Sequence, residues 1–145
     1  MSKVASAANI MGVDIDQLNA QLATIVSVTR EAPESIGTAL KTVYARMSDI
    51  EAGLDSETTL GEYTQQMESL GIKALDAKGN LRDMGDVVEE IGGKWDTFSR
   101  NQQVALAQAI AGTRQYSRMM ALFDNWSMYE SAKDTSKNSL GALEQ

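Results

Sequence analysis

The stretch PESIGTALKTVYARMSDIEAGL, residues 33–54, carries the clearest structural signal in the chain. Proline suits the first turn of a helix, because it has no backbone N–H to leave unbonded and its φ is already helical. Apolar residues then recur at intervals of four and three, which places them along one face of a helix as in a coiled-coil seam. We therefore predict a helix whose buried seam consists of Ile36, Leu40, Val43, Met47, Ile50 and Leu54.

Helix starts are also readable on either side of this segment. A capping box pairs an N-cap side chain with a Glu or Gln three residues later, and each bonds the other's backbone N–H. Three such pairs are predicted, Asp14 with Gln17, Thr59 with Glu62 and Ser99 with Gln102. The first of these helices should bury Ile15, Leu18, Leu22 and Ile25 on one face. With a single proline and few β-branched clusters, the chain is predicted to be all-α, a bundle of about six or seven short helices.

The segment IKALDAKGNLRD, residues 72–83, differs from the rest. Two short half-apolar arms flank a turn in which Gly79 can take a positive φ, so a small β-hairpin is expected near residues 72–82. Asp83 would then cap the next helix. The acidic residues here do not match a calcium-binding loop, because Lys78 stands where the third position needs an oxygen ligand.

Glycines mark two further joints. In AIAGTRQYSRMMAL, residues 109–122, Gly112 and Thr113 interrupt good helix formers and predict a corner between two helices. An anion site at this corner is the alternative, but the phosphate-loop pattern GxxxxGK[ST] is absent from the chain. The pair Gly92–Gly93 predicts a bend or a close helix–helix approach.

Composition limits the possible functions. The chain has 145 residues and a net charge of −7, which disfavours DNA and anionic membranes as partners. It lacks cysteine and histidine, which excludes most zinc sites and the Ser-His-Asp and Cys-His triads. No apolar stretch is long enough for a membrane span. We expect one helical domain over residues 1–130 and a polar tail over 131–145 that begins a further helix, the whole excised from a longer chain.

No catalytic, cofactor-binding or metal-ligating residue is predicted. Glu89 and Glu90, the adjacent acidic pair nearest an aromatic, point about 100° apart on a helix and are interpreted as solvated surface. Methionine and aromatic side chains near the C-terminal helices offer a possible partner surface, with core packing as the alternative. The possible contact residues are Arg114, Arg118, Met120, Trp126 and Met128.

Three segments together resemble the tail tape measure proteins of long-tailed bacteriophages and related prophages. APESIGTALKTVYARMSDIEAG (32–53) is similar to a helix entered by proline, and LGIKALDAKGNLRDMGDVVEEI (70–91) to a Gly-Asn-Leu-Arg turn leading into an acidic helix. ALAQAIAGTRQYSRMMALFDN (105–125) is similar to a segment in which glycine and a basic residue precede a leucine-rich helix. No piece is a strong motif alone; their order over about residues 5–130 carries the resemblance.

The resemblance implies a structural role without a cofactor: a helical core that templates tail tube polymerisation and sets tail length. It implies the tail tube protein, tail assembly chaperones and tail tip or baseplate proteins as partners, no nucleic acid binding, and a location in the virion tail after assembly in the host cytoplasm. Self-association through the 36–54 seam stays open. Two alternatives are a helical adaptor that binds a partner through a Met and aromatic surface, and a cell-wall-cleaving enzyme module, which the absent His and Cys disfavour.

Overall fold

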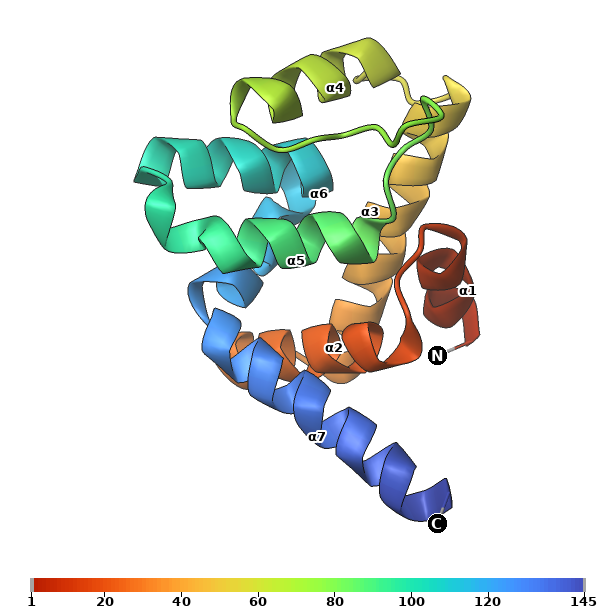
Figure 1. Ribbon diagram of the computed structural model, residues 1–145, viewed down its shortest axis with the longest axis vertical. Coiled ribbons are helices and arrows are strands. Elements are labelled where there is room, and N and C mark those ends of the chain that lie inside the picture. The colour runs from red at the N-terminus through yellow and green to blue at the C-terminus, as the bar shows by residue number, and fades with distance from the viewer. Residues whose placement is uncertain (1, 145) are drawn as a thin grey trace.

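A computed structural model describes the backbone of residues 2–144 and the side chains of residues 4–135. Over this part of the chain it contains seven α-helices and one short 3₁₀-helix (Figure 1). They are α1 (Ser2–Ile10), α2 (Ile15–Thr29), α3 (Pro33–Ala52), α4 (Leu60–Ser69), α5 (Met84–Lys94), η1 (Trp95–Thr97), α6 (Arg100–Asp124) and α7 (Trp126–Glu144). The prediction of an all-α bundle is confirmed.

α3 lies at the centre of the packing. It contacts α1, α2, α4 and α6, and its buried side chains include five of the six predicted seam residues. Leu54 is the exception, with 75% of its surface exposed. The helix ends at Ala52, and the Leu54 N–H folds back to the Asp49 carbonyl (2.8 Å) in a left-handed turn at Gly53. Leu54 therefore no longer lies on the helical face that continues the seam.

The predicted helix starts are largely confirmed. All three capping boxes form with both hydrogen bonds in place, at the starts of α2, α4 and α6. Pro33 occupies the first turn of α3, as predicted. Two details differ: Asp83 precedes α5 without a side-chain capping bond, and Ile15 is 50% exposed because it is the first residue of α2.

The β-hairpin predicted near residues 72–82 is wrong. The described residues there form one isolated antiparallel bridge, between Leu75 and Leu81, and no strand. Two backbone hydrogen bonds join the two arms, from Asp76 N–H to the Asn80 carbonyl and from Arg82 N–H to the Ala74 carbonyl, and a third within the turn runs from Gly79 N–H to the Asp76 carbonyl. The Leu81 N–H does not bond to the other arm but donates to a Glu51 carboxylate oxygen (3.1 Å) on α3. A pair of arms this short is marginal in water, and attachment to helices stabilises it instead.

The corner predicted at Gly112 is confirmed as a kink inside α6. Gly112 has φ 77° and ψ 173°, a backbone conformation that L residues rarely adopt. The break removes the usual i+4 partners of the preceding carbonyls. Arg46 of α3 replaces them, because its guanidinium donates to the carbonyls of Ala109 (2.9 Å) and Ile110 (3.0 Å) and to the Thr58 hydroxyl. One arginine thus caps a helix end that lies more than sixty residues away in sequence.

We predict that Arg46→Met lowers the free energy of unfolding by about 2 kcal/mol, because two half-buried carbonyls lose a charged hydrogen-bond donor while the apolar stem is retained. Urea unfolding followed by circular dichroism measures the change. Lys41→Met is the matched control, because Lys41 is exposed on the same helix and forms no hydrogen bond or ion pair with the described residues. Equal stabilities for the two variants would contradict the capping role of Arg46.

Candidate functional site

The first turn of α7 is joined to the rest of the bundle by a row of aromatic rings. Trp95 stacks on Phe123 (centroids 4.7 Å apart), Phe123 lies 6.0 Å from Trp126, and Trp126 stacks on Tyr129 (4.3 Å). The Trp126 ring also covers Gly92, where an added Cβ would lie 2.2 Å from the ring atoms. The predicted close approach at Gly92–Gly93 is therefore confirmed, and Gly92 is the residue that requires it.

An ion pair holds the outer end of this aromatic row. The Trp95 indole N–H donates to the Asp124 carboxylate (2.8 Å), which also accepts from Arg100 (3.0 Å). Burial raises the pKa of Asp124, but hydrogen bonds from Arg100 and Trp95 outweigh it and lower the pKa below its ordinary value. These contacts join the start of α6 to its end and orient η1.

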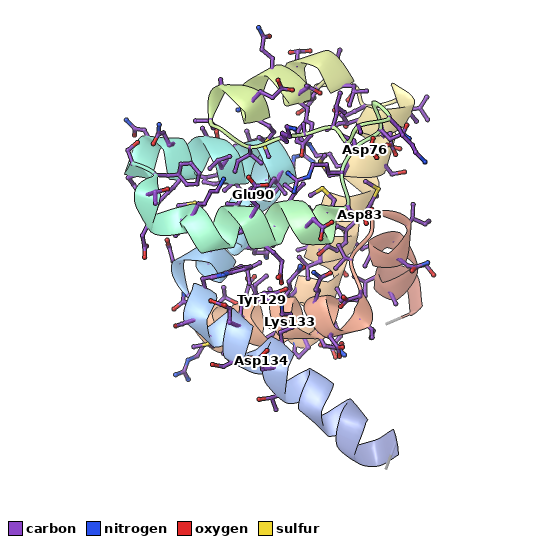
Figure 2. The ribbon with its side chains drawn as sticks, viewed as in Figure 1. Asp76, Asp83, Glu90, Tyr129, Lys133 and Asp134 are labelled. Carbon is purple, nitrogen blue, oxygen red and sulfur yellow. The ribbon has the colours of Figure 1, made fainter. Side chains whose placement is uncertain are left out.

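A second ion pair joins α5 to α7. The Glu89 carboxylate of α5 accepts from the Tyr129 hydroxyl (2.6 Å) and the Lys133 ammonium (2.7 and 2.8 Å). Figure 2 labels Tyr129 and Lys133 on the part of α7 that crosses α2, and α2 is the main neighbour of α7. Burial raises the pKa of Glu89, yet the bonds from Lys133, Tyr129 and the Gln17 side chain lower it overall.

The prediction that Glu89 and Glu90 are solvated surface is wrong. Both are half-buried, and Glu90 pairs with Arg82 (2.7 Å) and Lys94 (3.0 Å). The two carboxylates do point in different directions, as their helical spacing requires. Each finds cations from another part of the fold: Glu89 from α7, and Glu90 partly from the segment before α5. The spacing in sequence could not reveal these partners, because Lys133 is 44 residues from Glu89.

The α2 side of this region contains buried polar groups. Gln21 and Thr24 are fully buried one turn apart on α2, and the Gln21 carbonyl oxygen accepts from the Tyr44 hydroxyl. Among the described residues, neither the Gln21 Nε2 nor the Thr24 hydroxyl has a hydrogen-bond partner. Tyr44 lies close enough to Tyr129 to help raise its pKa, after burial and Glu89. We call Glu89 and Gly92, the two α5 residues that side chains of α7 contact, the α7 seat.

The predicted partner-contact residues do not share one environment. Met120 is buried in the core (7% exposed), Trp126 is half-buried on the α7 seat, and Met128 is 44% exposed. Arg118 is half-buried and pairs with Glu31 (2.6 Å), which joins α6 to the end of α2, whereas Arg114 is exposed. Of the five, Arg114 and Met128 present the most surface. Their role in partner contact stays a prediction.

The surface of the described residues includes two open clefts beside α3. The larger, about 730 Å³, lies beside the Gly112 kink and is lined by both cations and acids from α3, the α3–α4 loop and α6. The smaller, about 410 Å³, lies where Arg118 faces the start of α3. Among the described residues, no group of three or more Asp and Glu side chains is placed to hold a metal ion. No helix in this part of the chain is long and apolar enough to cross a membrane.

The charged side chains that meet inside this molecule bind one another or backbone groups, and so join its helices to one another. A family model described as phage-related minor tail protein matches residues 1–112, from α1 to the kink in α6. The chain belongs to this family, which indicates a structural role in a phage tail. No solved structure matches the chain.

We predict that Gly92→Ala destabilises the protein by about 1–3 kcal/mol, because the methyl group would overlap the Trp126 ring and force the ring away from α5. Gly93→Ala is the matched control: its Cβ would meet nothing within 4 Å, and alanine favours helix by up to about 1 kcal/mol. Thermal unfolding of both variants separates the two effects. A stable Gly92→Ala variant with unchanged Trp126 fluorescence would contradict the close approach.

The free energy of unfolding should fall as the pH drops below about 4.5. Glu89, Glu90 and Asp124 each have a lowered pKa in the folded protein, so the unfolded chain takes up protons first and is favoured as the pH falls toward the folded values. Urea titrations at pH 3 to 7 would measure this slope. Glu89→Gln should flatten it, whereas Glu68→Gln, on the exposed side of α4, should leave it unchanged.

Proposed function

We propose that this chain is a segment of a tape measure protein, which templates polymerisation of the tail tube and sets tail length. Membership of the phage-related minor tail protein family carries the proposal, together with the ordered resemblance of residues 32–53, 70–91 and 105–125. These segments supply most of α3, α5 and α6. Under this proposal the chain has no enzymatic activity, and it acts with tube, chaperone and tail tip proteins.

The physical basis of measurement is the fixed rise of a helix, about 1.5 Å per residue, which converts sequence length into distance. The net charge of −7 supports a role beside DNA rather than bound to it, because the chain and the phosphate backbone repel each other. Assembly would take place in the host cytoplasm, and the virion tail would be the final location.

The length that this segment would contribute to a ruler depends on whether it stays folded in the tail. A folded domain of this size has a diameter of about 40 Å, based on a radius of gyration near 15 Å. A folded domain would therefore contribute about 40 Å to a ruler, whereas a fully extended helix of 117 residues would contribute about 175 Å. The positive-φ glycines Gly53 and Gly112, at helix ends, are places where the compact form can open.

The test is electron microscopy of tails assembled with an in-frame deletion of residues 14–130 in the parent protein. We expect tails shortened by up to about 175 Å if the segment is extended in the tail, and by about 40 Å if it stays folded. A duplication of the same residues should lengthen tails by the same amount. Replacement by an unrelated helical segment of 117 residues is the matched control, and it should restore length if the segment acts as a ruler.

The second candidate is a helical adaptor that binds a partner protein, favoured by the exposed Met128 near the start of α7. In that case the deletion would abolish tails or leave their length unchanged, and the unrelated helix would not restore assembly. Either result would contradict the tape measure proposal.

A further inference from the structure

α7 is attached to the rest of the fold through a single non-helical residue. Asn125 has φ −123° and ψ 41°, between the end of α6 and the start of α7. Its backbone N–H and side-chain amide both donate to carbonyls of α6, and its own carbonyl accepts from the first turn of α7. All of these bonds are local. A rotation about this residue would therefore leave the hydrogen bonds that join Arg46 and Glu31 to α6 intact.

The described part of α7 buries little apolar surface. Tyr129 is its one fully buried large side chain, and Trp126 is half-buried. By contrast, the second half of α6, just before the joint, buries four large apolar side chains, Met119, Met120, Leu122 and Phe123. Apolar burial is the dominant stabilising contribution in such a bundle, and residues 126–135 of α7 have less of it than the second half of α6.

Polar contacts replace the missing apolar ones. Lys133 and Tyr129 both bind Glu89, so the charged contact across the seat depends on one carboxylate. Figure 1 also shows the C-terminal end of α7 projecting past the other helices.

We propose that α7 is a strap that opens about Asn125 as one unit while the other helices stay folded, and that the Glu89–Lys133–Tyr129 contact is its catch. Opening uncovers the α7 seat and frees the Trp126 ring from Gly92. This inference does not depend on the tape measure proposal, because it concerns the chain in isolation.

Native-state hydrogen exchange of the wild-type chain tests the proposal. The amides of residues 129–135 should exchange through an opening populated at least a hundredfold more than the opening that exposes residues 43–47 in α3. The α7 opening should also depend on urea less steeply than global unfolding does, because it exposes less surface. If α7 and α3 exchange with equal protection and equal urea dependence, α7 opens only by global unfolding and the proposal is wrong. This comparison needs no variant.

Lys133→Met tests whether the Glu89–Lys133–Tyr129 contact holds α7 closed, because the substitution keeps the apolar stem and removes the ammonium group. We expect about a tenfold increase in α7 exchange with no change in α3. Lys94→Met is the matched control: it removes an exposed ion pair to Glu90 within α5, so α7 exchange should not change. Equal acceleration of α7 and α3 by Lys133→Met would overturn the assignment of the catch.

A distance measurement provides an independent readout. The chain has no cysteine, so spin labels at Asn19→Cys on α2 and Glu130→Cys on α7 would be unique, and both positions are exposed. We expect one short distance in the doubly labelled chain that retains Lys133. We expect a second, longer population of distances when that chain also carries Lys133→Met. A single unchanged distance in a folded Lys133→Met variant would contradict the proposal.

Discussion

The buried face of α3 is the contact surface on which most of the other helices depend. Its side chains Ile36 to Ile50 meet α1, α2, α4 and α6, so one stripe of about four turns organises both ends of the bundle. Arg46 adds a polar contact at the edge of this stripe, where it completes the helix that the Gly112 kink interrupts. Removing the stripe would leave α1 without its main neighbour and would take from α4 and α6 one of the helices that they contact.

Part of the chain's charge is used in ion pairs that join its helices. The chain carries 20 acidic residues and 13 basic ones, and several of the basic residues are engaged inside the fold. Arg82, Arg118 and Lys133 are each half-buried in ion pairs that join elements distant in sequence. Each of these pairs neutralises one carboxylate together with one cation, so the charges outside the pairs still sum to −7. A partner protein of this chain would meet a surface on which carboxylates predominate.

Sequence reasoning succeeded where the cause of a structure is local. Capping boxes, the proline at the start of α3 and the glycine at the α6 kink depend on residues within one or two turns, and all were predicted. It failed where a distant group decides the outcome. The segment around Leu75 was predicted as a hairpin, but contacts with helices hold it, and Glu89 was predicted as solvated surface although α7 covers it. Of the α7 seat, only Gly92 could be anticipated from the sequence. A glycine pair inside a helix indicates that another element packs closely against it, but not which element does so.

The Arg46 cap also has a consequence for the order in which the chain folds. The carbonyls of Ala109 and Ile110 are completed by a side chain that precedes them by more than sixty residues. During synthesis α3 leaves the ribosome well before α6, so the guanidinium is already in place when the helix that needs it emerges. The kink can then form at once against α3, so the carbonyls at the end of the unfinished helix stay exposed for only a short time. In a circularly permuted chain with α6 synthesised first, that protection would be lost.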